Sequence, residues 1–505
     1  MRASPPRLLA AAVGLLGCAS GAAAQPVPAE GLPVEKISLQ NGMRVLVLPR
    51  QGAPTVSLVV QYGVGSVNER LGTTGIAHLL EHLLFKGTTT VGTRDLVAER
   101  ELLARADAAH DTLLALRGIH DSTGMARLQA RVRILEDSAR AYVVSNEFDR
   151  ILSTNGARGL NAITTVEATT YFVELPSNRT ELWFVLEADR MRNPVFREFY
   201  TERDVVMEER RMRVETSPGG LLYESHLATA YRMHPYGVPV VGWMSDLENL
   251  SREQVEAYYR RYYGPNNAVV AIVGDVDASR IRGWVRRYLE PLARGDPPPP
   301  VLAVEPQQRG ERRVEVEFDA EPALRVGWHV PDLFHEDAPA LAMLSSILTG
   351  GRASRLHRRL VVEERLATSV TSSMGPGDLF PQLFQIDAVP RAPHTTAEVE
   401  AALYQELETL AEEPPTEEEL QRVRNQLEAG NVRRLQSNLG LAFQLAGSES
   451  LFGDWRQTFR LSRRVQGVRP GDVHRVVRRY FLPSNRTVAT LVKASPLPSR
   501  PELAR

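Results

Sequence analysis

The sequence predicts an α/β protein, with β-sheets layered against helices, built from two homologous halves. Two segments, Arg260–Gly274 (RRYYGPNNAVVAIVG) and Arg478–Leu491 (RRYFLPSNRTVATL), align at a constant offset of 218 residues. Both have the pattern of a helix end, a turn and a strand, which indicates duplication of a whole half. Between them, Pro291–Arg313 contains four consecutive prolines and is typical of a stiff, extended linker. We therefore predict an export signal over 1–24, a first half over 25–290 with a helical insertion at about 93–151, a linker over 291–313, a second half over 314–495 and a tail over 496–505.

Composition limits the class of protein. A chain of 505 residues with 43% apolar and 24% charged residues is typical of a soluble protein of two or more domains. The 60 basic and 61 acidic residues leave a net charge of −1. Because there is no basic excess, we expect no nucleic-acid partner.

The first 24 residues have the features of a bacterial export signal. Arginines lie within Met1–Arg7, and Leu8–Leu16 is an apolar core too short to span a bilayer. Ala22–Ala24 offers a cleavage site, whereas Cys18 follows a stretch that resembles a lipobox. Plain cleavage is favoured, because Leu16 is unusual at its lipobox position. We expect a periplasmic protein, or one tethered to the outer membrane through a lipid on Cys18.

The first half should begin with strands. Val34–Leu48 is predicted to form two strands around Gln40–Gly42, because Asn-Gly is a strong hairpin signal. Thr55–Tyr62 should be a third, buried strand. Gly159–Pro176 is rich in β-branched and aromatic residues, which predicts a strand. Leu182–Met191 is predicted to be a helix.

A long helical hairpin is expected within the first half. Thr93–Ile151 has leucines, alanines and arginines at helical spacing, with a break at His120–Gly124. Its dense charge favours a solvated face, and contact with a partner is the alternative.

A metal-binding motif lies in Gly75–Gly87 (GIAHLLEHLLFKG). On a helix, His78 and His82 would lie on one face, and Glu81 would border it. Two imidazoles can hold a catalytic zinc ion, and a neighbouring carboxylate can take a proton from the bound water. The H-x-x-E-H pattern is the inverted form of a zinc-protease motif. Because burying these side chains without a partner would be costly, the apolar flanks strengthen the prediction of zinc. The second half has no such motif.

A third protein ligand is expected from the predicted helix Glu202–Thr216 (ERDVVMEERRMRVET). Glu202 and Glu209 are two turns apart on one face, whereas Glu208 is rotated by about 100°. Two histidines and a glutamate are a common set of zinc ligands. The alternative is that these acids only pair with nearby arginines along the helix.

Taken together, these motifs resemble the pitrilysin–insulinase zinc peptidases, in particular the branch with the mitochondrial processing peptidase and two-half bacterial members. The resemblance covers nearly all of residues 34–493. The matching segments are GIAHLLEHLLFKGT (Gly75–Thr88), GLNAIT (Gly159–Thr164), ERDVVMEE (Glu202–Glu209), HPYG (His234–Gly237), YYGPNN (Tyr262–Asn267) and VGDV (Val273–Val276).

The resemblance implies two halves that face each other as a clamshell and a zinc endopeptidase that cuts extended peptides. It implies zinc bound by His78, His82 and Glu209, with Glu81 as the general base and Glu202 as a supporting acid. The strand at Asn161 and Ala162 would receive the substrate backbone.

The chain departs from the family pattern in two places. The gap between His82 and Glu209 is long, and the predicted helical hairpin accounts for the excess. In the second half, Val362 and Thr368 stand where family members often carry an Arg and a Tyr that hold substrate and the oxyanion. This departure implies a metal-free paralogous subunit that carries the Arg/Tyr pair. The alternative function is a catalytically silent member that acts in peptide binding or assembly.

Overall fold

The computed structural model describes residues 32–117 and 121–493. The predicted export signal over 1–24, with Cys18, and the predicted tail over 496–505 lie outside the described residues. Within the described part of the chain, no helix is both long and apolar enough to cross a membrane.

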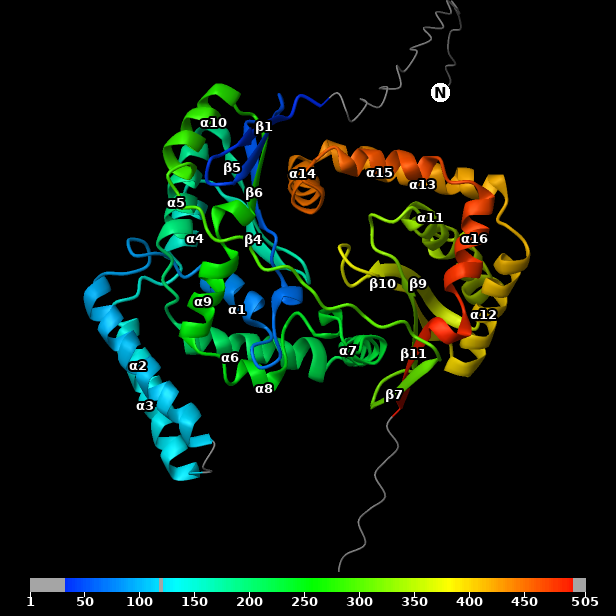
Figure 1. Ribbon diagram of the computed structural model, residues 1–505, viewed down its shortest axis with the longest axis horizontal. Coiled ribbons are helices and arrows are strands. Elements are labelled where there is room, and N and C mark those ends of the chain that lie inside the picture. The colour runs from blue at the N-terminus through cyan, green and yellow to red at the C-terminus, as the bar shows by residue number, and fades with distance from the viewer. Residues whose placement is uncertain (1–31, 118–120, 494–505) are drawn as a thin grey trace, which may run out of the picture.

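Two β-sheets form the centres of the two halves (Figure 1). The first sheet has the order β1-β2-β6-β3-β5-β4, and the second has the order β7-β11-β8-β10-β9. The strands are β1 (Glu35–Ser38), β2 (Arg44–Pro49), β3 (Thr55–Tyr62), β4 (Arg158–Thr164), β5 (Thr169–Pro176), β6 (Ala268–Gly274), β7 (Arg312–Phe318), β8 (Ala323–Val330), β9 (Ala367–Gly375), β10 (Gln382–Pro390) and β11 (Arg486–Lys493).

The sheets show that the chain is a duplication. In each half, one parallel pair (β2 with β6, β7 with β11) is followed by antiparallel neighbours in the same order. Strands β6 and β11 come from the two copies of the sequence repeat. The prediction of an α/β fold with two homologous halves is confirmed, and the halves face each other as a clamshell (Figure 1).

The predicted single strand Gly159–Pro176 is wrong, because it contains a turn. The chain reverses over residues 165–168, and β4 pairs antiparallel with β5. The hydroxyl of Thr165 accepts hydrogen bonds from the backbone N–H groups of Glu167 and Ala168. A threonine turn of this kind replaces the glycine, proline or asparagine that marks most turns, so the pattern of β-branched residues hides it.

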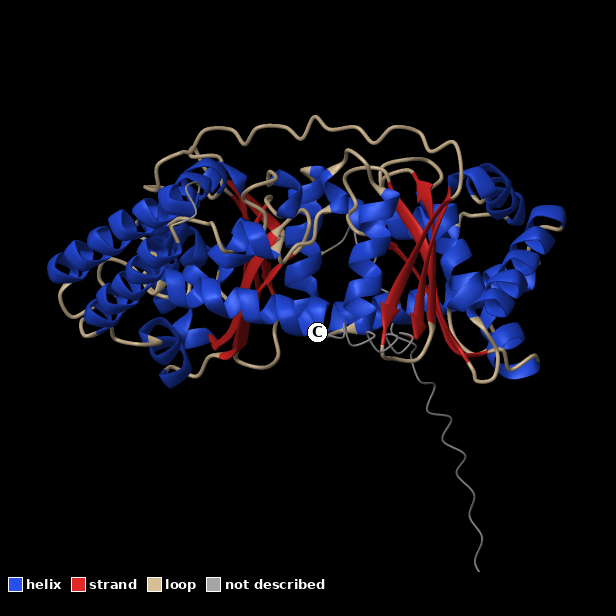
Figure 2. Cartoon of the chain, turned by 90° about the horizontal axis from the view of Figure 1, so that it is seen from below, coloured by secondary structure: helices blue, strands red, loops and turns tan. Residues whose placement is uncertain are grey.

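Helices cover both sheets (Figures 1 and 2). They are α1 (Ile76–Leu83), α2 (Leu96–Arg117), α3 (Ser122–Arg140), α4 (Glu147–Thr154), α5 (Thr180–Arg192), α6 (Phe199–Arg210), α7 (Pro218–Ala230), α8 (Met244–Leu247), α9 (Arg252–Tyr262), α10 (Ala278–Trp284), α11 (Ala338–Thr349), α12 (Thr396–Glu412), α13 (Glu417–Gln436), α14 (Asn438–Phe452), α15 (Gln457–Gln466) and α16 (Pro470–Tyr480). Helix α6 continues as a π-helical turn over Arg211–Glu215.

The predicted helical hairpin is formed by α2 and α3, which project from the first half as an arm (Figure 1). Its base is part of the core. The side chains of Glu99 and Arg197 are fully buried and form an ion pair of 2.7 Å. Arg197 also donates hydrogen bonds to backbone carbonyls of Lys86, Thr88 and Val91. The arm is therefore anchored close to the end of α1.

Each half covers the sheet of the other with one helix. Helix α14, from the second half, packs on β3 and β6 of the first sheet, and α7, from the first half, packs on β7 and β11 of the second. The predicted linker has no helix or strand over residues 293–310 and runs across both halves as the long loop in Figure 2. The halves are thus joined by packed helices as well as by the linker.

Candidate metal centre

Helix α1 carries the H-x-x-E-H motif and is fixed at its start. Gly75 precedes the helix with φ 84°, a left-handed conformation that favours glycine. A Cβ at this position would lie 2.6 Å from the carbonyl oxygen of Val241, so only glycine fits. The buried carboxylate of Glu69 accepts hydrogen bonds from the N–H groups of Gly75 (2.8 Å) and Ala77 (2.9 Å). These contacts fix α1 one residue before its first histidine.

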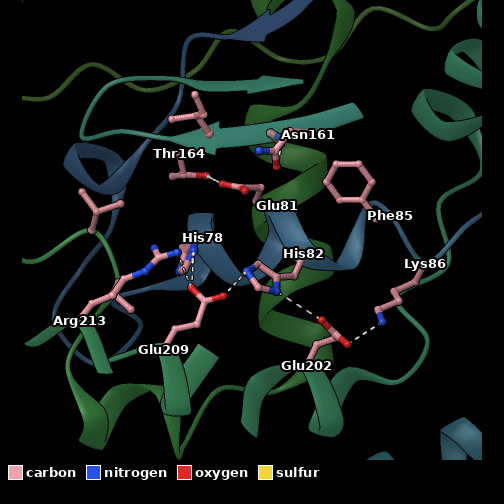
Figure 3. A pocket seen from close by; sticks show the side chains of 14 residues that line it. His78, Glu81, His82, Phe85, Lys86, Asn161, Thr164, Glu202, Glu209 and Arg213 are labelled. Carbon is pink, nitrogen blue, oxygen red and sulfur yellow. Dashed lines mark hydrogen bonds and ion pairs between the residues drawn. The ribbon is translucent and has the colours of Figure 1, made fainter. Parts of the chain in front are cut away.

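His78, His82 and Glu209 converge between α1 and α6 (Figure 3). One ligand atom from each residue lies within 4.8 Å of the others. The Nε2 atoms of His78 and His82 each lie 3.6 Å from a different carboxylate oxygen of Glu209. Among the described residues, this is the one group of His, Cys, Asp and Glu side chains spaced to hold a metal ion.

The donor set fits a zinc ion. Zinc takes imidazole nitrogen and carboxylate oxygen ligands and keeps an open position in catalytic sites. The buried Oε2 of Glu209 accepts no hydrogen bond, although Arg213 Nη2 lies 3.2 Å away. Burial, together with the charges of His82 and Arg213, lowers the pKa of His78 to about 3. His78 is therefore neutral at neutral pH, as a metal ligand must be.

Glu202 contacts His82 at the ring nitrogen that does not face Glu209. Its carboxylate lies 3.3 Å from His82 Nδ1 and 2.5 Å from Lys86 Nζ. Burial lowers the pKa of His82, but the hydrogen bond with Glu202 and the neighbouring carboxylates outweigh it, so the pKa of His82 is raised. Glu208 instead pairs with Arg211 at the surface. The structure thus brings Glu202 and Glu209 to α1 and turns Glu208 away, as the helical spacing predicts.

Glu81 lies on the side of the cluster that faces β4 (Figure 3). Its carboxylate accepts a hydrogen bond of 2.5 Å from the hydroxyl of Thr164, the last residue of β4. Burial raises the pKa of Glu81, and the hydrogen bond from Thr164 partly opposes this effect. Thr164 was not predicted as a site residue; its only sequence signal is its place at the end of the GLNAIT segment.

The cluster opens into a pocket of about 660 Å³ that also exposes strand β4. β4 is an edge strand of the first sheet, so one side of its backbone has no partner strand. Asn161, Ala162 and Thr164 of β4 line the pocket. Phe85, Lys86 and Arg213 also line the pocket and were not predicted as site residues.

Val362 and Thr368 lie away from this pocket. Val362 is 53% exposed on the π-helical turn His357–Glu363. Thr368 is exposed on β9, and its hydroxyl donates a hydrogen bond to the carbonyl of Val389. Neither residue is among those that line the pocket.

Over residues 32–117 and 121–493, fold and site together define a two-halved α/β clamshell with one candidate metal centre, in the first half. Two family models match the chain. The insulinase model (peptidase family M16) covers residues 44–111 and 133–242, and the model described as "Peptidase M16 inactive domain" covers residues 249–427. The chain belongs to the insulinase family, peptidase family M16. The insulinase model skips residues 112–132, of which the described residues 112–117 and 121–132 belong to the outer part of the α2–α3 arm.

Related proteins and solved structures agree with this assignment. The chain is 29% identical over 466 residues to "Zinc protease PqqE" of Helicobacter pylori, covering 90% of this chain and 92% of that protein. It is 28% identical over 458 residues to an uncharacterized zinc protease of Mycobacterium bovis, covering 89% and 91%. The crystal structure of a protease from Helicobacter pylori matches with a TM-score of 0.77 and 27% identity, covering 91% of this chain and 99% of that one.

Proposed function

We propose that the protein is a zinc-dependent endopeptidase that hydrolyses extended peptides. The observation that carries this proposal is the convergence of His78, His82 and Glu209 within 4.8 Å, beside a glutamate held by the edge strand. A site without catalytic use would have no reason to combine these groups. Family membership and the names of the relatives support the same class of activity.

The proposed mechanism assigns one task to each group. His78, His82 and Glu209 would hold zinc, which when bound polarises a peptide carbonyl and acidifies water. Glu81 takes the proton of the attacking water and returns it to the leaving amine. Thr164 fixes the orientation of the Glu81 carboxylate through its hydrogen bond. The raised pKa of Glu81 makes it a stronger base than an ordinary glutamate.

The substrate would bind as an added strand. The free edge of β4 presents backbone N–H and C=O groups to the pocket. An extended peptide can pair with them, which gives affinity without dependence on side chains. Asn161 and Ala162 would lie beside the peptide, with the scissile bond above α1. A folded protein cannot present such a strand, so the substrates should be flexible peptides.

Two single substitutions test the metal and the base. Glu209→Gln should lose most bound zinc, and Glu81→Gln should retain zinc but lose activity by roughly 10² to 10⁴-fold. Zinc is measured by elemental analysis, and activity with a mixed peptide library. Glu208→Gln is the matched control, because Glu208 lies next to Glu209 in sequence but pairs with Arg211 at the surface. Zinc loss from Glu208→Gln but not from Glu209→Gln would refute the ligand assignment. A zinc-bound chain that cleaves no peptide, alone or with a partner, would instead favour a silent, peptide-binding member.

We further propose that the chain acts as the zinc subunit of a two-subunit enzyme. Val362 and Thr368 offer no side chain to the pocket, so the second half lacks the Arg/Tyr pair implied by the family resemblance. A metal-free paralogue that carries the pair would supply it. Peptidase turnover should therefore rise when such a paralogue from the same genome is added. Full activity of the pure chain, unchanged by the paralogue, would contradict the proposal.

Export to the periplasm is also proposed, on the basis of residues 1–24 alone. The mass of the mature protein from a periplasmic extract tests it, since cleavage after Ala24 and lipidation of Cys18 give different products.

A further inference from the structure

The two ends of the pocket differ in chemistry. Figure 3 shows Arg213 on one side of the His78–Glu209–His82 cluster and Phe85 with Lys86 on the other. Strand β4 passes along the cluster, with Thr164 toward the Arg213 end and Asn161 toward the Phe85 end (Figure 3). A peptide laid along β4 would therefore place side chains from opposite sides of the scissile bond near these two ends.

The two cations of the pocket are not equivalent. The charge of Lys86 is already paired, because its Nζ lies 2.5 Å from Glu202 and 3.4 Å from Glu198. Within the described residues, Arg213 makes one ion pair, with Glu209 Oε2 at 3.2 Å. That oxygen belongs to the proposed zinc ligand, whose negative charge a bound metal ion would neutralise. No other carboxylate in the described part of the chain then pairs with Arg213.

The position of Arg213 makes its charge available to a ligand. Its side chain is 65% exposed, although it stands beside a largely buried cluster. It lies on the π-helical turn Arg211–Glu215, a widened turn of the kind often found at functional sites. The neighbouring Arg210 is engaged with Glu224 and Glu215. Only Arg213 of this turn lines the pocket.

We propose that Arg213 selects peptides with an acidic side chain close to the scissile bond, on one side of it. This proposal rests on the proposed peptidase function and names its substrate class. The guanidinium can bind a carboxylate through two parallel hydrogen bonds, which a glutamine or lysine side chain cannot accept in the same way. The opposite end, with Phe85, offers an aromatic surface and no free cation.

Paired peptides test the proposal. Each pair differs only by Glu, Gln or Lys at one position near the cleaved bond, and kcat/KM is measured for the zinc-loaded chain. We expect a preference of roughly tenfold for Glu over Gln, lost in Arg213→Gln and reversed toward Lys in Arg213→Glu. Arg211→Glu is the matched control, because Arg211 lies on the same turn but pairs with Glu208. It should leave the preference unchanged.

A binding measurement separates this proposal from the proposed function. In the Glu81→Gln background, the affinity for a fluorescent Glu peptide should exceed that for its Gln analogue, and Arg213→Gln should abolish the difference. This comparison holds even if the chain cleaves no peptide, an outcome that would refute only the proposed function. An unchanged preference in Arg213→Gln would overturn the role of Arg213. So would an equal loss for Glu and Gln peptides with zinc retained, because Arg213 would then act on the reacting groups.

Discussion

Three glutamates surround the two histidines of α1, and their neighbours give them different tasks. Glu209 faces both imidazoles and keeps an oxygen without a hydrogen bond. Glu202 is held by Lys86 and orients His82 from the far side of the ring. Glu81 is half-buried against β4, and this partial burial raises its pKa. A single residue type thus serves as candidate ligand, orienting group and base because its electrostatic surroundings differ.

A fourth glutamate, Glu69, fixes the start of α1 from a buried position that disfavours its charged form. Burial raises the pKa of Glu69 to about 8, although the N–H groups of Gly75 and Ala77 oppose this effect. Between the ordinary pKa of about 4.5 and this value, the folded chain keeps a proton that the unfolded chain has lost. Unfolding therefore releases a proton in that range, so the contribution of Glu69 to stability falls as pH rises from about 4.5 to 8.

We predict that Glu69→Gln removes this part of the pH dependence. We compare the free energy of unfolding of the unmodified chain with that of Glu69→Gln. The difference should decline between pH 5 and pH 8, by at most about 1.4 kcal/mol for each pH unit. Urea-induced unfolding at pH 5, 6.5 and 8 measures it. Other titrating groups are common to both chains and cancel in the difference. Glu208→Gln, at an exposed position, should show no such trend. A constant difference across this range would show that Glu69 keeps an ordinary pKa.

At the scale of elements, local pattern predicted most of the first sheet. The Asn-Gly turn separates β1 from β2, and β3 has the predicted bounds Thr55–Tyr62. Helix α1 and the shared face of Glu202 and Glu209 also follow from residue spacing alone. These features depend on side-chain period, which the sequence displays directly. The turn between β4 and β5 was not predicted, because a threonine hydroxyl stabilises it and no glycine marks it.

Contacts between distant segments could not be predicted in this way. The hydrogen bond from Thr164 to Glu81 joins residues 83 positions apart. Arg197 anchors the base of the arm through Glu99, which an apolar pattern does not reveal. The same holds for Arg213, whose place in the pocket follows from a π-helical turn that the spacing of charges does not signal. Such residues become visible only when the topology brings them together.

At the scale of the whole molecule, the exchange of α7 and α14 makes the halves interdependent. The face of the first sheet that points toward the second half is apolar, and α14 with α15 buries it (Figure 1). The cluster comprises Leu46, Leu48, Val59, Val269, Ala271, Val273, Leu441, Ala442, Leu445, Ala446, Trp455 and Phe459. In return, Leu222 of α7 packs with Val316, Ala489 and Leu491 of the second sheet. A further contact joins the turns, where Glu167 accepts hydrogen bonds from the N–H groups of Asp378 and Leu379.

This arrangement predicts that neither half is stable alone but that the two halves assemble without a covalent link. A chain cut between Pro298 and Pro299 breaks only the linker, which has no helix or strand. Expressed separately, the first half would expose the sheet face that α14 covers, and we expect it to aggregate. Co-expressed, the two fragments should purify as a one-to-one complex with the zinc content of the intact chain.

The contact between α14 and the first sheet determines how tightly the two fragments bind each other. Leu445→Ala removes a fully buried side chain from α14 and should weaken assembly by about 2–5 kcal/mol, whereas Leu302→Ala, at an 81% exposed position in the linker, should have no effect. Size-exclusion chromatography and the dissociation constant of the fragments measure both. If the first-half fragment by itself is monomeric, unfolds cooperatively and binds zinc, the prediction is wrong. The first sheet would then be stable without α14. If only the complex binds zinc, and the first-half fragment does not, the metal centre depends on a helix from the second half. Every candidate ligand nevertheless comes from the first half.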